Sequence, residues 1–207
     1  MLIYSLDLFG TFVFAISGTL AVTEKRLDFL GAFVMGFVTA VGGGTVRDML
    51  LNVSPGWLTD LNYFYIILAA VVLSFLAKTG LQKLRKAFFL FDSLGIAVFT
   101  VIGLEKALHY EIALPIAILM GVMSAVTGGA LRDVLTNEIP LIFRKEIYAT
   151  ACVLGAVLFL ILQKAGVNPN FNLLLTATLI TLIRIVSVKY NLALPTLKPD
   201  RKGSKKV

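Results

Sequence analysis

Seven long apolar runs follow one another along the chain, and short polar or helix-breaking segments separate them. Each run is close to the roughly 20 residues that a helix needs to cross a bilayer. The runs are too long and too continuous for the tilted strands of a membrane barrel, so we expect helices. The predicted spans are residues 4–23, 29–51, 62–79, 88–105, 112–135, 147–164 and 171–189.

Composition excludes a soluble domain and gives no sign of an enzyme. Of the 207 residues, 58% are hydrophobic and 15% are charged, whereas soluble domains are nearer half apolar and a quarter charged. The single Cys152 excludes a disulfide framework, and the single His109 excludes metal sites that need two histidines. No set of nucleophile, base and orienting group stands out, and there is no GxSxG elbow. We therefore expect neither catalysis nor a resident cofactor or metal.

The distribution of positive charge predicts the topology. The net charge of +7 does not indicate a nucleic-acid partner, because most of the basic residues lie between apolar runs or near the C-terminus. Cytoplasmic loops are the basic ones, and the other side holds only Lys106 and Lys164. This puts the N-terminus outside, the C-terminus inside, and residues 190–207 in a basic cytoplasmic tail that is disordered or attracted to anionic lipid. The basic side carries Lys25, Arg26, Lys78, Lys83, Arg85, Lys86, Arg144, Lys145 and the tail from Lys189.

The first half of the chain recurs in the second half at a fixed offset. The 85 residues that separate Asp7 from Asp92 also separate many other matched positions, without a gap. Apolar sequence gives chance matches of Leu and Val, but it does not give a doubled Gly-Gly-x-x-Arg-Asp at one offset. Other matched pairs are Gly10 with Gly95, Phe14 with Phe99, Gly36 with Gly121, Asn52 with Asn137, and Pro55 with Pro140.

The repeat predicts an all-α membrane protein with an inverted internal symmetry. Each copy holds three spans, and an odd number of crossings makes the second copy enter from the opposite face. The copies are then related by a pseudo-twofold axis in the membrane plane, as in many transport proteins. Residues 1–87 form the first repeat, 88–170 the second, and 171–189 a seventh helix outside the repeat.

Glycine runs at the centre of each repeat are the main candidates for an ion path. Each glycine in a helix interior costs about 1 kcal/mol relative to alanine, so consecutive glycines predict a kinked or unwound helix. Loosened backbone at membrane depth must be buried or must face a wet cavity, where it can bind ions. The alternative is that the glycines only allow close packing between helices. The candidate path residues are Thr39, Gly42, Gly43, Gly44, Ser124, Thr127, Gly128 and Gly129.

Two Arg-Asp pairs follow the glycine runs, Arg47-Asp48 and Arg132-Asp133. Ionisable residues inside a span are costly, which favours a functional role, although an arginine near a span end can also extend to the headgroups. Neighbours on a helix point about 100° apart, so we expect each arginine to pair across the copies or with Asp7 and Asp92. The alternative for these two acids is that they stabilise a helix N-terminus. Arg184 has no repeat partner, and we expect it to extend to the headgroups or to face lipid.

The motifs GGGTVRD and TGGALRD, in two three-helix units followed by a seventh helix, resemble the prokaryotic branch of the trimeric intracellular cation (TRIC) channels. That branch is also catalogued as putative glycine transporters. The resemblance implies a homotrimer in the inner membrane of a prokaryote, with a potassium-permeable path in each protomer between second and fifth helices kinked at Gly42–Gly44 and Gly128–Gly129. It implies K+ or Na+ in the path and contacts with membrane lipid. Animal members bind inositol lipid near a lysine motif, where this chain has Arg132-Asp133.

The sequence thus predicts a channel for monovalent cations, chiefly potassium. Arg47 and Arg132 near the path would by themselves favour anions. Cation selectivity then requires backbone carbonyls, or neutralisation of the arginines by Asp7, Asp48, Asp92 or Asp133. The alternative is a secondary carrier for a small zwitterion such as glycine, whose carboxylate and ammonium groups the same helices could bind.

Overall fold

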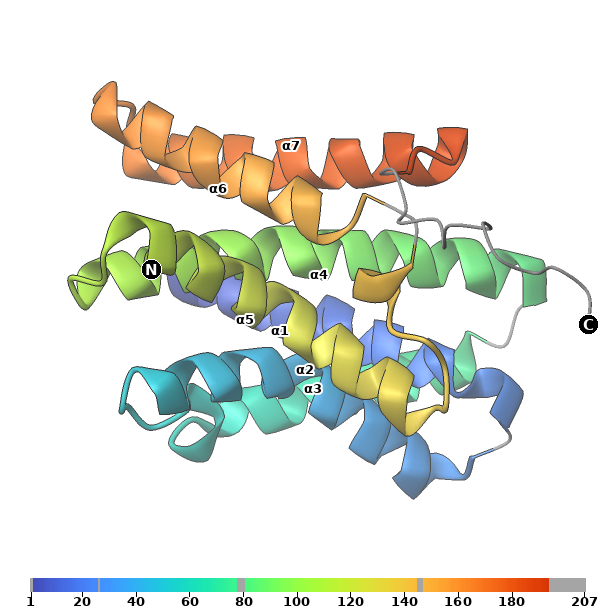
Figure 1. The fold of residues 1–207 in the computed structure, drawn as a ribbon. Helices are drawn as coiled ribbons and strands as arrows, with labels where there is room; N and C mark the ends of the chain where they lie inside the picture. Colours follow the sequence, from blue (N-terminus) through green and yellow to red (C-terminus); the bar gives the residue numbers. More distant parts are fainter. Residues whose placement is uncertain (1, 26, 78–80, 145–146, 194–207) are drawn as a thin grey trace, which may run out of the picture.

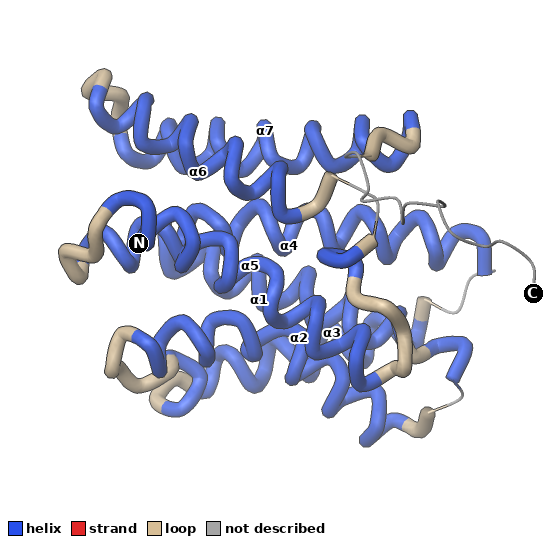
Figure 2. Tube along the Cα trace, in the orientation of Figure 1, coloured by secondary structure: helices blue, strands red, loops and turns tan. Residues whose placement is uncertain are grey.

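The computed structural model describes residues 2–25, 27–77, 81–144 and 147–193. Within these ranges the elements are seven α-helices and three one-turn 3-10 helices, joined by short loops (Figures 1 and 2). In chain order they are α1 (Leu2–Ala21), η1 (Thr23–Lys25), α2 (Phe29–Leu50), η2 (Gly56–Leu58), α3 (Leu61–Leu76), α4 (Leu81–His109), α5 (Leu114–Leu135), η3 (Leu141–Phe143), α6 (Ala149–Lys164) and α7 (Pro169–Tyr190).

Each predicted span corresponds to one helix. Five helices are long and apolar enough to cross a membrane, while α3 and α6 are apolar but only 16 residues long. The largest difference is at α4, which begins at Leu81 rather than at residue 88. Its first turns carry Lys83, Arg85 and Lys86, so the helix extends beyond its apolar segment, and hydropathy detects only the apolar part. The predicted tail lies outside the described residues from 194 onward.

The sequence repeat is also a structural repeat. The bounds of α5 and η3 are those of α2 and η2, each advanced by 85 residues. Both long helices are followed by an asparagine with a left-handed backbone, Asn52 with φ 55° and Asn137 with φ 59°. Asparagine tolerates this conformation well, so the same residue type ends the same element twice.

The second copy runs upside down relative to the first. Figure 1 shows α1 and α4 lying against each other in opposite directions. At the crossing of α2 and α5, Gly43 lies against Ser124 while Gly128 lies against Thr39, so residue numbers rise along one helix as they fall along the other. Helix α4 is central: α1, α5, α6 and α7 all pack against it.

The glycine runs do not unwind their helices. Gly42–Gly44 and Gly128–Gly129 are α-helical throughout, so the expectation of unwound backbone is wrong. A Cβ at Gly43 would clash with the carbonyl oxygen of Ser124, and a Cβ at Gly128 would clash with that of Thr39. The close-packing alternative is correct for these two glycines, because only a missing side chain lets the two backbones approach so closely.

Candidate functional site

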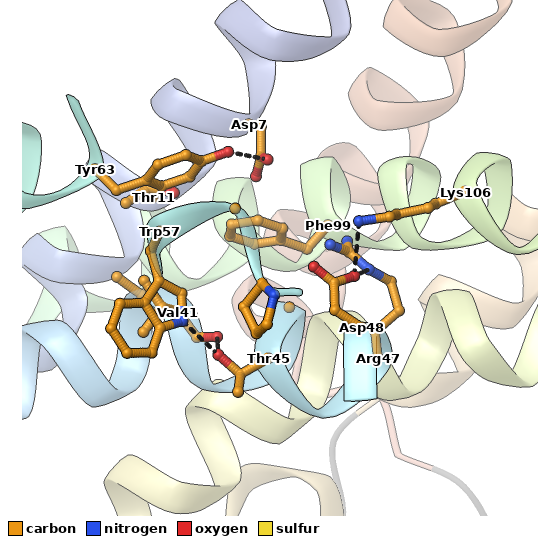
Figure 3. Close-up of a pocket in the computed structure, with 14 residues that line it drawn as sticks. Asp7, Thr11, Val41, Thr45, Arg47, Asp48, Trp57, Tyr63, Phe99 and Lys106 are labelled. Atoms are coloured by element: carbon orange, nitrogen blue, oxygen red, sulfur yellow. Dashed lines mark hydrogen bonds and ion pairs between the residues drawn. The ribbon is translucent and has the colours of Figure 1, made fainter. Parts of the chain in front are cut away.

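A polar cavity of about 100 Å³ lies between α1, α2, α4 and the segment from η2 to α3 (Figure 3). It is built mostly from the first repeat, and α4 adds Phe99 and Lys106. No residue of α5 lines it. Of the predicted path residues, only Gly44 is in its wall. The side chains that give it polar character are Asp7, Thr11, Thr45, Arg47, Asp48, Trp57, Tyr63 and Lys106.

Two basic side chains contact the same carboxylate oxygen of Asp48 in the wall of this cavity. Asp48 Oδ1 lies 2.7 Å from Arg47 Nε and 2.9 Å from Lys106 Nζ. Neighbouring residues on α2 therefore do pair, contrary to the expectation, because the long arginine side chain spans the angle between them. Arg47 Nη1 also donates to Ser124 Oγ at 3.3 Å, which links the two repeats. We name Arg47, Asp48 and Lys106 the cavity triad.

The opposite wall presents an acid held by a phenol rather than by a cation. Tyr63 donates its hydroxyl proton to Asp7 Oδ2 at 2.6 Å, and Figure 3 shows the two side chains meeting across the top of the cavity. No arginine or lysine of the described residues lies within ion-pair distance of Asp7. The predicted pairing of Asp7 with an arginine is therefore wrong. Below it, Trp57 Nε1 donates to Thr45 Oγ1 at 2.9 Å.

The second repeat carries a matching cluster that is buried. Arg132 Nη1 lies 2.8 Å from Asp92 Oδ1, and Arg132 Nε lies 2.8 Å from Asp133 Oδ1. The predicted pairing of Arg132 with Asp92 is therefore confirmed. Both residues are 0% exposed. Asp92 lies well inside α4 rather than at its start, so it does not stabilise a helix N-terminus. We name Arg132, Asp92 and Asp133 the buried triad.

Aromatic rings and a second arginine enclose the buried triad. The Phe88 ring centroid lies 4.5 Å from the Arg132 guanidinium carbon, and the Tyr148 ring lies 4.6 Å from that of Arg184. Arg184 is 0% exposed and donates from Nη1 to the carbonyl oxygen of Ile147 at 2.7 Å. The expectation that Arg184 extends to the headgroups or faces lipid is therefore wrong. Its face of α7 packs toward α4 and α6, so it is internal to the bundle.

The remaining predicted residues do not line the cavity. Thr39, Gly42, Gly43, Ser124 and Gly128 lie at the crossing of α2 and α5, whereas Gly129 faces Tyr148 and the buried triad. Thr39 and Thr127 donate to the carbonyl oxygens of Met35 and Met123, one turn earlier in their own helices. Ser124 accepts from Arg47. The two threonine hydroxyl groups are therefore satisfied within their own helices, and that of Ser124 by the other repeat.

Sequence reasoning missed the aromatic and cationic partners. In the sequence, Tyr63 and Trp57 are typical of aromatic residues at a membrane interface. Lys106 is typical of a loop charge that sets the topology. One signal could have identified Tyr63: the 85-residue offset places it on Tyr148, which also contacts the acid of its own repeat, at 3.4 Å from Asp92 Oδ1. Among the described residues, no group of three or more His, Cys, Asp or Glu side chains is placed to hold a metal ion.

The fold and site define a multi-pass membrane protein made of two inverted three-helix repeats around paired Arg-Asp motifs. A family model described as "Glycine transporter" matches the chain twice, at residues 4–79 and 89–164. A UPF0126 membrane protein from Vibrio cholerae is 41% identical over 94% of this chain and 82% of its own length. The UPF0126 inner membrane protein YadS of Escherichia coli K12 is 40% identical over 98% of this chain and all of its own length. The chain belongs to this family of multi-pass inner membrane proteins.

Solved structures confirm the resemblance to TRIC channels. A TRIC trimeric intracellular cation channel orthologue from Rhodobacter sphaeroides superimposes with a TM-score of 0.86, at 35% identity over 92% of this chain and 98% of that one. A prokaryotic TRIC channel crystallised in 0.5 M KCl also gives 0.86, at 30% identity over 94% and 99% of the two chains. The chain has the prokaryotic TRIC fold and is homologous to these cation channels. This relationship agrees with the expectation that it is not an enzyme.

Proposed function

We propose that this protein is a homotrimeric channel for monovalent cations, chiefly potassium, with one ion path in each protomer. The observation that carries the proposal is the cavity among membrane-spanning helices, because hydroxyl groups and two carboxylates line it inside an otherwise apolar bundle. Polar and charged groups inside a membrane-spanning bundle are costly, so their presence favours a role in transport. Homology to prokaryotic TRIC channels supports the same function and the trimer.

The ion path begins in this cavity and continues past the crossing of α2 and α5. Gly44 belongs to the cavity wall, and the adjacent Gly43 belongs to the crossing. Beyond the crossing, toward the far end of α5, lies the buried triad. Because the two backbones are in direct contact at Gly43 and Gly128, conduction along this route requires α2 and α5 to separate slightly there.

Charge balance around the cavity is compatible with cations. Arg47 is neutralised by Asp48, and Lys106 is balanced by Asp7 on the opposite wall. Only a hydroxyl group is bonded to the Asp7 carboxylate, so this acid can attract a passing cation. The positive-inside rule places the cavity mouth outside and the buried triad toward the cytoplasm. Reporter fusions at each terminus test that orientation.

Planar-bilayer recording of the purified native protein tests the channel directly. The expected result is unitary current steps whose reversal potential follows the potassium gradient. The double variant Thr11→Ile with Thr45→Ala places the residues of the second repeat in the cavity wall, and it should lower the unitary conductance several-fold. Thr178→Ala is the matched control, because this hydroxyl lies on the exposed side of α7 and bonds only to Leu174. An unchanged conductance in the double variant would contradict this route.

A carrier of a small zwitterion is the second candidate function. The family model's own description names glycine. The cavity presents a carboxylate, Asp7, opposite the two cations of the cavity triad, so it offers one partner for an ammonium group and others for a carboxylate. Saturable uptake of radiolabelled glycine into liposomes, without unitary currents, would favour this function over the channel.

A further inference from the structure

The cavity triad and the buried triad receive opposite charges from the same helix. Helix α4 contributes Lys106 to Asp48 at one end and Asp92 to Arg132 at the other. The cavity triad then has one net positive charge, and the buried triad one net negative charge. The position equivalent to Lys106 in the first repeat is Ala21. Repeat symmetry therefore does not account for this lysine.

Local structure does not require Lys106 either. Asp48 already accepts a 2.7 Å bond from Arg47, which is nearly as buried as the acid itself. The lysine side chain is 30% exposed, whereas that of Asp48 is 2% exposed. A partly solvated ion pair with a flexible lysine contributes little to stability. Its ammonium group nevertheless lies in the wall of the cavity, where it contributes a full positive charge.

We propose that Lys106 determines the charge selectivity of the ion path by setting the electrostatic potential of the cavity. This inference rests on the proposed channel function. With the lysine present, the charges of Asp7 and the cavity triad cancel. Without it, the cavity has one net negative charge and concentrates cations. Even at the dielectric constant of bulk water, one unit charge about 6 Å away changes a cation's local concentration about threefold.

Substitution of the lysine gives the first test. Lys106→Gln should raise the ratio of potassium to chloride permeability about threefold or more, measured from reversal potentials in asymmetric KCl. Lys106→Arg keeps the charge and should leave the ratio unchanged. Lys164→Gln is the matched control, because this lysine lies on the same predicted side but borders an apolar groove between α5 and α6. An equal ratio in the native protein and Lys106→Gln overturns the proposal.

Chemical restoration of the charge gives a second test, in which the comparison is made within one folded variant. In Lys106→Cys, a trimethylammonium-ethyl methanethiosulfonate should restore a positive charge and lower the permeability ratio, whereas the sulfonatoethyl reagent should raise it. The native Cys152 is 0% exposed, so it does not compete for these reagents. Equal effects from both reagents would show that only size matters and would overturn the proposal. Absence of currents from the unsubstituted protein would instead contradict the channel function itself.

Discussion

The two repeats place the same Arg-Asp motif in opposite environments. In the first repeat the motif borders a polar cavity, and in the second it is sealed among aromatic and aliphatic side chains. Four equivalent positions account for much of the difference, because each is polar or amphipathic at the cavity and aliphatic in the other half. These pairs are Thr11 with Ile96, Thr45 with Ala130, Trp57 with Ile142, and Lys106 with Ala21.

This comparison separates what the motif does from what its surroundings do. In both halves the arginine bonds the adjacent aspartate, at 2.7 Å for Arg47 and 2.8 Å for Arg132. The motif is therefore a structural unit that fixes the end of α2 and of α5. Whether that end opens into a cavity depends on the residues around it. The predictions below test this division, beginning with the largest expected effect.

Replacement of equivalent acids should affect the two halves unequally. Asp92→Asn should destabilise the protein by about 2 kcal/mol, because it weakens a fully buried 2.8 Å bond to Arg132, although Asp133 still balances the arginine charge. Asp7→Asn should cost less than about 1 kcal/mol, since Asp7 has a hydroxyl partner beside a cavity. Thermal unfolding in detergent measures both. Equal losses would mean that the two sites are energetically alike and that the distinction drawn above is wrong.

The seam between the halves should respond sharply to one methyl group. Gly43→Ala should cost about 2 kcal/mol through overpacking against the Ser124 backbone. The adjacent Gly44→Ala is the matched control, since its Cβ would meet only Arg47 Nη2 at 3.6 Å, and the helix gains up to about 1 kcal/mol. Melting temperatures of the two variants in the same detergent decide the outcome. A stable Gly43→Ala protein would show that the crossing is loosely packed.

Sequence alone predicted the helices and the inverted repeat, but not the use of the glycines. The lengths of the apolar runs and the constant offset between the repeats each depend on many residues. A wrong interpretation of one residue therefore does not change the predicted helices or repeat. Consecutive glycines have two physical outcomes, unwinding or close contact, and the choice depends on which backbone lies opposite. For Gly43 that backbone is at Ser124, in the other repeat, and no local feature of the sequence reveals this contact.

The site was predictable only where its partners are close in sequence or share the repeat offset. Asp7, Asp48, Asp92 and both motif arginines were found because charges within spans are rare. Lys106 was not, because its position at the end of α4 gives it the sequence context of a loop charge. Its contact with Asp48 depends on how α4 lies against the first repeat, which only the folded structure determines.

The equivalent tyrosines Tyr63 and Tyr148 should also contribute unequally to stability, with a smaller difference than that between the two acids. Tyr63→Phe removes a 2.6 Å bond to a carboxylate and should cost about 1 kcal/mol. Tyr148→Phe removes only a 3.4 Å contact to Asp92 and keeps the ring beneath Arg184, so it should cost less than about 0.5 kcal/mol. Unfolding temperatures again give the difference. A larger loss for Tyr148→Phe would place the stronger phenol–acid bond in the buried half.

The smallest expected effect on stability concerns the hydrogen bonds that Asp60 accepts from Tyr4 and Asn62 in the first repeat. Asp60 accepts from the Tyr4 hydroxyl at 2.5 Å and from the Asn62 backbone at 2.9 Å, where it caps α3. At the equivalent positions the second repeat has Phe89, Lys145 and Ile147.

The hydrogen bond from Tyr4, followed by that from the Asn62 backbone, lowers the pKa of the Asp60 carboxyl below its ordinary value. A lowered pKa means that the folded protein holds the ionised form more tightly than the unfolded chain does. The contribution is therefore complete above the ordinary aspartate pKa of about 4 and disappears as the pH falls through the lowered value. Because Asp60 is outside the spans and exposed to solvent, the effect is small. Melting temperatures of the native protein and Asp60→Asn should differ slightly at pH about 6 and converge under strong acid. Parallel curves over that range would show that the carboxylate charge makes no contribution at this end of the first repeat.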